Sequence, residues 1–587
     1  MGNKWGTACL ASCAEPCCPC VVSKKVPWRK DGSQLTEQFM SRSLQHGIPD
    51  PQSSGHTGGL RRAAIPRSAF VTTLRREIFA VGEGLMSTMW RLHLSYVGGD
   101  GGSTSSWPEK VVAKTTPPKL RARAVGAVLK LFRSEVEWYT RSMPAITGLA
   151  APKCFYAADG GYGRYCLLLE DMAPAKTVSQ LQGLDKARAL VATRAAARLH
   201  ARYRDRVGVA PETKDWVLRA DDDHYYSLVG KTYRTALAAL FKNGGARFKR
   251  YEMDPDTAVS TSFRAAADLV ARRWDTLQAA RRDMAAPASS GSTRHATLCH
   301  GDFRVENMFF DAGGTGAMLD GADARFRAVD YQLVKEYAGE SDLSYFVSGS
   351  LTPETRRACE REILLEYYHA VRAGMIANRW GSTAATRGLG EGAEGARGGG
   401  VADYPMKELL LEYQGSLLNP LVLSICAQAE TTGSESARGR RLVRECMFRR
   451  IDEMLSDWNF LASLEMTLKK YEEGPHPTWT MDEARAVLPK QWHDLLAMDG
   501  PSSTHDAAAS APFHAGGSFV VAKERSKVTH SVEQDAMHEA LPGELDGSEE
   551  AHFRNRLASL DRRERGDLGT IGEEGGGGGG AVVVPSG

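Results

Sequence analysis

The hydrophobic pattern separates a strand-rich first part of the chain from a longer helical part. Short apolar runs predict four strands: two that flank residues 80–87, one at 110–114 and one at 165–172. From residue 185 onward the apolar spacing is that of helices, which predicts helices at 185–204, 353–376, 405–428 and 438–471. This order favours an α+β protein with a small β-rich lobe and a larger, mainly helical lobe.

A helical stripe between the third and fourth strands carries a charged residue. From Leu120 the apolar positions follow one helix face: Ala124, Ala127, Val128, Leu131, Phe132, Trp138 and Tyr139. Glu135 lies on that face, whereas Glu137 points outward. A carboxylate on an apolar face requires a cation, and alternation places Lys114 on the same strand face as Val112. The pattern therefore predicts a Lys114–Glu135 ion pair, with a solvated lysine at a strand end as the alternative.

The segment His300-Gly301-Asp302-Phe303-Arg304-Val305-Glu306-Asn307 carries the chemistry, together with Asp330 in Val329-Asp330-Tyr331-Gln332. Phosphoryl transfer needs a carboxylate that orients the attacking hydroxyl and oxygen ligands that hold Mg²⁺ on the nucleotide phosphates. Asp302 supplies the first, and Asn307 and Asp330 supply the second. Turn residues 311–314 predict a hairpin that brings Asn307 and Asp330 together. A purely structural loop is the alternative, since Gly-Asp is also an ordinary turn pair.

Three segments resemble a known group of kinases. HGDFRVENMFF, AVDYQ and SDLSYFVSGSL are similar to the aminoglycoside phosphotransferase and choline kinase group, and within it to the ecdysteroid-kinase-like branch. The resemblance covers about residues 68–500. It implies a bilobal protein-kinase-like fold, ATP and Mg²⁺ as cofactors, and a small-molecule hydroxyl as acceptor, with Asp302 as catalytic base. A family sets the reaction class better than the substrate.

The resemblance also implies roles for residues outside the catalytic loop. Lys114 matches the phosphate-binding lysine and Glu135 its ion-pair partner, while Gly82, Gly84 and Ser87 form a loop over the phosphates. Two further sets are implied: Glu170 and Met172 as the hinge that meets adenine, and His300 and Asp342 as supports of the catalytic loop. Asp342 has an alternative role as the cap of the helix that begins near residue 340. His200 resembles a family histidine and is interpreted as structural.

Two other functions compete with a small-molecule kinase. A catalytically weak scaffold of the same fold commonly loses a metal ligand or the base, and neither is missing here. A protein kinase is disfavoured because HGD replaces HRD, DYQ replaces DFG, and no APE segment is present. A net charge of +3 on 587 residues gives no sign of nucleic-acid binding. No apolar run reaches the length expected of a membrane-spanning helix.

The ends of the chain are expected to be disordered. We divide it into a tether with a cysteine cluster (1–66), an N-lobe (67–170), a C-lobe (171–500) and a tail (501–587). Six dispersed cysteines predict reduced thiols in a cytoplasmic protein. Gly2 is a candidate for myristoylation and Cys17, Cys18 and Cys20 for palmitoylation, which predicts peripheral attachment to the cytosolic face of a membrane. A metal-binding cysteine tract, a poor signal peptide and an inert tail are the alternatives.

Overall fold

The structure is a computed structural model. It describes residues 26–27, 31–47, 63–79, 87–98, 106–142, 149–161, 163–241, 245–285, 295–310, 326–386, 404–429, 436–474 and 477–499. Several predicted features lie outside these ranges: the lipidation candidates Gly2, Cys17, Cys18 and Cys20, the loop glycines Gly82 and Gly84, and the tail from residue 501.

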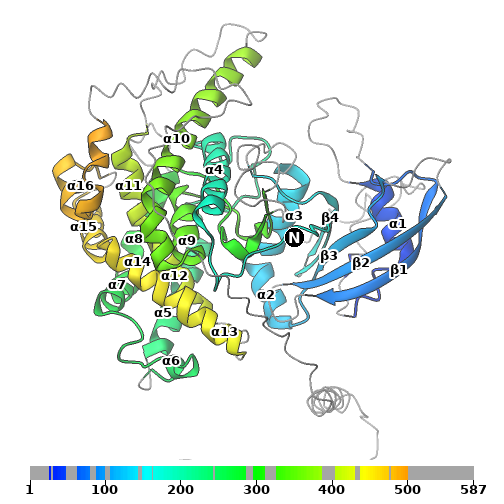
Figure 1. The fold of residues 1–587 in the computed structure, drawn as a ribbon, viewed down its shortest axis with the longest axis horizontal. Helices are drawn as coiled ribbons and strands as arrows, with labels where there is room; N and C mark the ends of the chain where they lie inside the picture. Colours follow the sequence, from blue (N-terminus) through cyan, green and yellow to red (C-terminus); the bar gives the residue numbers. More distant parts are fainter. Residues whose placement is uncertain are drawn as a thin grey trace, which may run out of the picture. The chain divides into compact units, whose positions relative to one another are not determined.

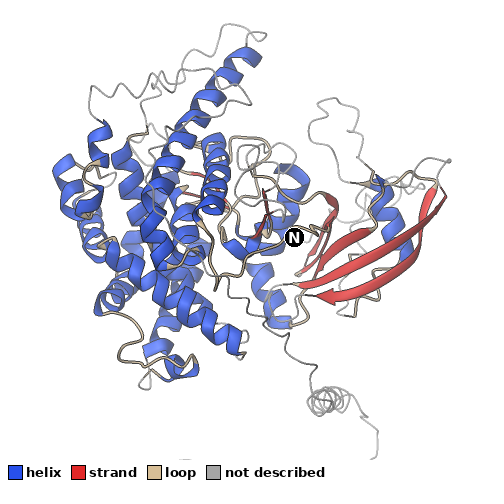
Figure 2. Ribbon diagram, viewed as in Figure 1, coloured by secondary structure: helices blue, strands red, loops and turns tan. Residues whose placement is uncertain are grey.

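Five antiparallel strands build the N-terminal sheet (Figures 1 and 2). They are β1 (Ala69–Phe79), β2 (Thr88–Gly98), β3 (Lys110–Thr115), β4 (Cys154–Gly161) and β5 (Arg164–Glu170), in the order β1-β2-β3-β5-β4. Lys114 pairs with Met89 of β2 and with Leu167 of β5, so it lies in the centre of the sheet. All four predicted strands are present, and β4 is an addition to them.

A helix before the sheet corrects the expectation of a disordered tether up to residue 66. Helix α1 (Glu37–His46) begins at Thr36, whose hydroxyl accepts a hydrogen bond from the Phe39 N–H. Met40 and Leu44 are fully buried in the same cluster as Trp90 and Leu168 of the sheet. α1 therefore covers the sheet face opposite to Lys114, because Leu168 and Trp90 alternate with residues of the Lys114 face.

The predicted helical stripe after β3 is interrupted. Helix α2 (Leu120–Val128) ends before Lys130, which has a left-handed backbone with φ of 57°, and α3 (Leu131–Glu137) starts there. The ring of Phe132 packs over Gly126, where an added Cβ would lie 2.2 Å from the ring. The prediction of a buried stripe is thus correct for α3, where Glu135 is buried. It is wrong for α2, where Val128 is 59% exposed.

The rest of the described chain is mainly helical. Its helices are α4 (Lys186–Tyr203), α5 (Asp223–Phe241), α6 (Ala246–Arg250), α7 (Thr261–Arg272), α8 (Trp274–Ala285), α9 (Glu340–Ser350), α10 (Pro353–Thr386), α11 (Met406–Gly415), α12 (Leu418–Cys426), α13 (Ala437–Leu442), α14 (Arg450–Asp457), α15 (Phe460–Glu473) and α16 (Met481–Val487). The helix predicted at 438–471 is divided, since Asn459 has a left-handed backbone between α14 and α15. The prediction of a small sheet lobe followed by a helical lobe is confirmed (Figure 2).

Two short antiparallel pairs carry the catalytic motif. β6 (Thr297–Cys299) pairs with β9 (Lys335–Tyr337), and β7 (Met308–Phe310) pairs with β8 (Phe326–Ala328). The second pair is the predicted hairpin. The Val329 N–H donates to the Asn307 carbonyl at 2.9 Å, so the strand ends place Asn307 next to the residue before Asp330.

One expectation on membrane segments needs correction. The helical stretch Met406–Cys426, which contains α11 and α12, is long and apolar enough to cross a membrane by length and composition. Just over half of its most apolar 18-residue window is buried inside the protein. Leu409, Leu410, Leu421 and Ile425 belong to the large core of the helical part. The six described cysteines are all free, as expected for reduced thiols.

Candidate active site

Lys114 forms a buried ion-pair cluster with two carboxylates. Its Nζ lies 2.8 Å from Glu135 of α3 and 2.8 Å from Oδ1 of Asp330. Burial alone lowers the pKa of Lys114, but Asp330 and Glu135 outweigh burial and raise it well above its ordinary value. Burial raises the pKa of Glu135 to about 7, although Lys114 acts in the opposite direction. The predicted ion pair is present, and it includes Asp330 as well.

Asp330 has a strained backbone that directs its carboxylate toward Lys114. Its φ of 70° lies in the left-handed region, which is rare for a residue with a side chain and clusters at functional sites. Burial raises the pKa of Asp330, but contact with Lys114 reverses this effect and the pKa lies below its ordinary value. Asp330 is therefore a charged carboxylate available to a cation.

The catalytic loop holds Asp302 and Asn307 against each other. The Asn307 Nδ2 donates to the carbonyl and to Oδ2 of Asp302, both at 2.9 Å. Because the amide nitrogen is engaged there, the oxygen is the atom that Asn307 can offer to a metal ion. Asn307 belongs to a short 3₁₀ turn, Val305–Asn307, whose first N–H donates to the Ser350 hydroxyl at 3.0 Å.

His300 and Gly301 shape the turn that presents Asp302. The His300 Nε2 donates to the Val329 carbonyl at 3.0 Å, and its Nδ1 accepts from the Asp302 N–H at 3.2 Å. Gly301 has φ of 82°, and an added Cβ there would lie 2.0 Å from the Leu333 carbonyl oxygen. The imidazole therefore joins this loop to the segment between β8 and Asp330, and only glycine fits before Asp302.

Asp342 supports this turn and does not cap its helix. Its carboxylate accepts from the N–H groups of His300 at 2.6 Å and Gly301 at 2.9 Å, and Gly339 occupies the cap position. His200 of α4 lies 3.3 Å from the same carboxylate and 2.8 Å from the Tyr367 hydroxyl. Burial raises the pKa of Asp342, but the contacts with His200, His300 and Gly301 keep it below its ordinary value.

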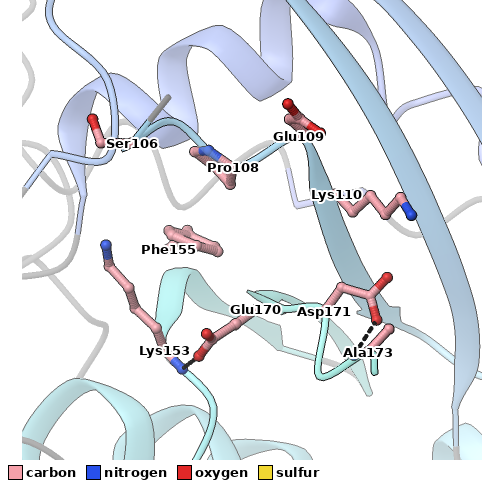
Figure 3. Close-up of a pocket in the computed structure, with 9 residues that line it drawn as sticks. All are labelled: Ser106, Pro108, Glu109, Lys110, Lys153, Phe155, Glu170, Asp171 and Ala173. Atoms are coloured by element: carbon pink, nitrogen blue, oxygen red, sulfur yellow. Dashed lines mark hydrogen bonds between the residues drawn. The ribbon is translucent and has the colours of Figure 1, made fainter. Parts of the chain in front are cut away.

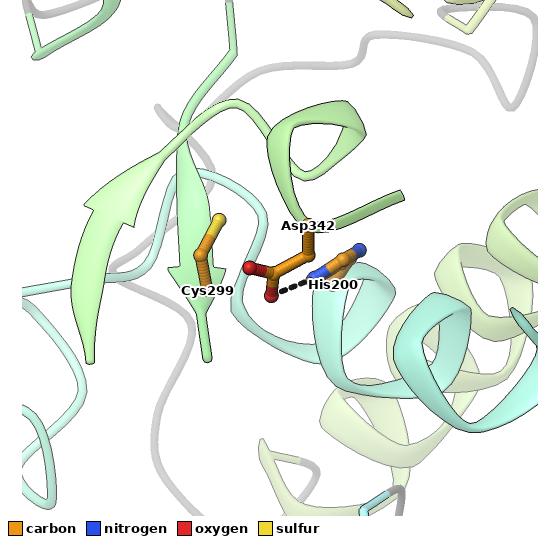
Figure 4. A group of neighbouring side chains, drawn as sticks. All are labelled: His200, Cys299 and Asp342. Carbon is orange, nitrogen blue, oxygen red and sulfur yellow. Dashed lines mark hydrogen bonds and ion pairs between the residues drawn. The ribbon is translucent and has the colours of Figure 1, made fainter. Parts of the chain in front are cut away.

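Cys299 lies beside His200 and Asp342, and their ligand atoms are within 4.8 Å of one another (Figure 4). The sulfur lies 3.3 Å from the Ala338 carbonyl and 3.5 Å from the Tyr337 carbonyl, which are acceptors for a thiol hydrogen. Burial raises the pKa of the Cys299 thiol well above its ordinary value. Of these three residues, His200 and Asp342 are bonded to each other, and Asp342 also bonds the backbone of His300 and Gly301, so these two side chains brace the loop.

The predicted hinge residues lie at the end of β5, with Glu170 as its last residue and Met172 just beyond it. Glu170 pairs with Val111 of β3, and its side chain accepts from the Lys153 N–H at 3.0 Å. This side chain lines a hollow of about 370 Å³ together with Ser106, Pro108, Glu109, Lys110, Lys153, Phe155, Asp171 and Ala173 (Figure 3). Glu170 alternates with residues of the Lys114 face, so its carboxylate points away from that face. Any contact of Glu170 with a base would therefore use the backbone.

Arg304 was missed by sequence reasoning. Its Nε lies 3.2 Å from Oδ1 of Asp302, so the predicted catalytic carboxylate has a cationic partner within its own loop. The signal was present, because Arg304 stands inside the motif between Asp302 and Asn307. Of the predicted phosphate loop, Ser87 is half-buried directly before β2, and Gly82 and Gly84 lie outside the described residues.

Comparisons with known proteins identify a family for this chain. The model of the ecdysteroid kinase-like family matches residues 81–376, just over half of the chain. No curated protein sequence matches it.

Solved structures similar to this chain include three small-molecule kinases. A choline kinase from Cryptosporidium parvum is 9% identical, with 75% of this chain and 95% of that chain covered and a TM-score of 0.34. An ethanolamine kinase from Plasmodium vivax is 12% identical, with 68% and 82% covered and a TM-score of 0.32. An amicoumacin kinase, in complex with AMP-PNP and Ca²⁺, is 11% identical, with 71% and 95% covered and a TM-score of 0.33.

The family match covers the motif, the ion-paired lysine and the elements from β2 to α9. The described chain has a small antiparallel sheet followed by a helical C-terminal part. The chain belongs to the ecdysteroid kinase-like family.

Proposed function

We propose that this protein is an ATP- and Mg²⁺-dependent kinase that phosphorylates a hydroxyl group of a small molecule. One observation carries the proposal: the buried residues Lys114 and Glu135 form one cluster with the partly buried Asp330, although Lys114 and Asp330 are 216 positions apart in the chain. Asp302 and Asn307 lie at the same loop-and-hairpin junction. Family membership supports a phosphotransferase that acts on small molecules.

The residues present fit Mg-ATP by the chemistry of their donor atoms. Asp330 and the Asn307 amide oxygen are the hard oxygen ligands that Mg²⁺ prefers, and Lys114 is a buried cation suited to phosphate oxygens. Glu135 keeps Lys114 charged and oriented when Asp330 turns to a metal ion. Mg-ATP bound here would supply the phosphoryl group and charge neutralisation at its phosphates.

Asp302 is placed to act on the acceptor. It accepts the proton of the acceptor hydroxyl as that oxygen bonds to the γ-phosphorus of ATP. The bond between this phosphorus and the β,γ-bridging oxygen breaks, and its electron pair leaves with ADP. The Asn307 amide holds the Asp302 carboxylate for this step, while His300 and Asp342 hold the backbone of the turn that carries it.

The direct test is ATP consumption against a library of hydroxylated metabolites, sterols and lipid headgroups, with the Asp302→Asn protein as the matched control. We expect at least one acceptor to stimulate ADP release in the wild type and not in the variant. Nucleotide binding without turnover on any acceptor would favour the scaffold alternative. Phosphorylation of a generic protein substrate would favour a protein kinase.

We also propose that the N-terminus attaches the kinase to the cytosolic face of a membrane by acylation of Gly2 and of Cys17, Cys18 and Cys20. One myristoyl chain binds membranes only marginally, so stable attachment needs the cysteines or nearby basic residues as a second signal. Fractionation of cells that express wild type, Gly2→Ala and a Cys17/Cys18/Cys20→Ser variant tests this. A soluble wild type, or variants that stay on membranes unchanged, would exclude acylation.

A further inference from the structure

Arg304 is bonded to the proposed catalytic carboxylate. The Arg304 N–H donates to the Asp302 carbonyl at 3.0 Å, which closes a tight turn and brings the side chain back over Asp302. Its Nε lies 3.2 Å from Oδ1 and 3.4 Å from Oδ2 of Asp302. The Asp302 side chain is 11% exposed and that of Arg304 25% exposed, so this ion pair is largely shielded from water.

Glu306 holds the other edge of the guanidinium. Arg304 Nη1 lies 2.6 Å from Oε2 of Glu306, and Arg438 of α13 binds Oε1 of Glu306 at 3.1 Å. Glu306 therefore keeps a cationic partner if Arg304 changes its contacts. Among the described residues, none accepts a hydrogen bond from Arg304 Nη2, so one donor edge of the guanidinium is available to a ligand.

The guanidinium is also placed where phosphate charge would develop. The acceptor hydroxyl must lie at Asp302, and the metal-bound phosphates must lie at Asn307 and Asp330. The Arg304 side chain contacts Asp302 directly, and the Arg304 carbonyl accepts a hydrogen bond from the Asn307 N–H at 2.9 Å. Arg304 is thus bonded both to the proposed base and to a proposed metal ligand. An arginine presents planar donors that suit phosphate oxygens.

We propose that Arg304 is a catalytic residue that binds the γ-phosphoryl group of ATP through its available edge while its Nε keeps Asp302 aligned. This inference rests on the proposed function. Asp302 takes the acceptor proton, the hydroxyl oxygen bonds to the γ-phosphorus, and the bond to the bridging oxygen breaks toward ADP. Arg304 neutralises charge on the phosphoryl oxygens throughout this step.

A tethering role alone makes a different prediction. If Arg304 only linked Asp302 to Glu306, its loss would slow turnover without discriminating between nucleotides. A residue that binds the γ-phosphoryl group instead distinguishes ATP from ADP. The ratio of affinities for triphosphate and diphosphate therefore separates the two roles independently of activity.

The experiment uses full-length wild type, Arg304→Gln, Arg304→Lys and the control Arg357→Gln, which removes a half-exposed arginine of α10 that pairs with Asp457. Calorimetry measures the affinity of each protein for Mg-ADP and for the Mg²⁺ complex of a β,γ-imido ATP analogue. We expect Arg304→Gln to lose roughly tenfold in affinity for the triphosphate, as for one charge-assisted contact, with ADP affinity unchanged. Arg304→Lys should recover part of the loss, and Arg357→Gln should resemble wild type.

Several outcomes would overturn the role of Arg304. One is a wild-type affinity ratio in Arg304→Gln, and another is an equal loss for both nucleotides, which would indicate a structural effect. The Arg304→Lys protein keeps the positive charge and most of the aliphatic part of the side chain. If Arg304→Gln does not fold, the ratio of affinities in Arg304→Lys therefore serves as the test. If the wild-type protein binds neither nucleotide, the proposed kinase function itself would be contradicted.

Discussion

At the scale of single residues, the charge of Asp302 is the property that an amide cannot replace. Asp302→Asn keeps the size of the side chain and its place beside Arg304 and Asn307, but it cannot accept the proton of the acceptor hydroxyl. We expect phosphoryl transfer to fall by roughly 10² to 10⁴, the usual range for a positioned general base. Turnover at wild-type rate in a folded Asp302→Asn protein, measured by ADP release, would contradict this assignment.

Asp330 belongs to nucleotide binding and is expected to behave differently. Asp330→Asn removes the charged oxygen ligand, and the remaining neutral Asn307 cannot offset phosphate charge alone. A charge-assisted contact is worth about 1.5–3 kcal/mol, so Mg-ATP affinity should fall roughly tenfold or more. Calorimetry with and without Mg²⁺ measures this. Asp302→Asn is the matched control, because it removes a neighbouring carboxylate and should leave Mg-ATP affinity close to that of wild type.

The residues of the motif could be predicted because residue types and their order along the sequence are enough to indicate their chemistry. Asp302, Asn307 and Asp330 have the types and the order that phosphoryl transfer needs, and Glu135 is on the buried face of its helix. The Lys114–Asp330 contact could not be derived this way. It depends on the left-handed backbone of Asp330, and a sequence pattern does not specify that an aspartate adopts it. Arg304 was overlooked because an arginine in a loop is ordinarily solvated.

At the scale of elements, the period of the hydrophobic pattern and the polar positions within it located the helices more accurately than the residues at which the helices begin and end. The helix predicted at 185–204 is α4, with Asp185 as its cap, because a clear cap precedes a regular apolar stripe. The break between α2 and α3 was missed. It depends on the contact of Phe132 with Gly126 and on a left-handed lysine, neither of which changes the hydrophobic period.

The contact between α4 and α11 predicts a pH dependence of stability. Arg204, at the end of α4, lies 2.7 Å from Glu408 of α11. Burial raises the pKa of Glu408 to about 7 and outweighs the opposite effect of Arg204. The folded state therefore holds this proton at pH values where the unfolded chain has released it. The stabilising contribution is complete below the ordinary carboxyl pKa and is lost as the pH rises through about 7.

Urea unfolding of wild type and Glu408→Gln at several pH values between 5 and 8 tests this effect. The glutamine is neutral throughout and carries no such dependence. The free energy of unfolding of wild type should fall relative to that of the variant as the pH rises, by at most about 1.4 kcal/mol per pH unit. Parallel profiles for the two proteins would show that Glu408 does not titrate in this range.

At the scale of the whole molecule, the two-lobed arrangement followed from the order of strands and helices, but the edge of the folded part did not. The segment 31–47 was assigned to a tether because it is short, polar and followed by low-complexity sequence. Its helix is stable only through tertiary packing, since a helix of 10 residues is marginal in water by itself. Part of its partner surface lies on β4, which is distant in sequence and therefore not visible from the helix alone.

This packing gives a prediction about two fragments of the chain, 31–499 and 67–499. The second fragment lacks α1 and exposes the sheet residues beneath Met40 and Leu44, both of which are fully buried. Burial of a side chain of this size contributes about 1.5–3 kcal/mol, so we expect 67–499 to be several kcal/mol less stable toward urea. It also loses the hydrogen bond at 2.8 Å from the Val71 N–H to the Ser41 hydroxyl. Met40→Ala/Leu44→Ala in the 31–499 fragment is the matched control, and it should reproduce most of the loss. Equal stability of the two fragments would show that α1 is not part of the folded lobe.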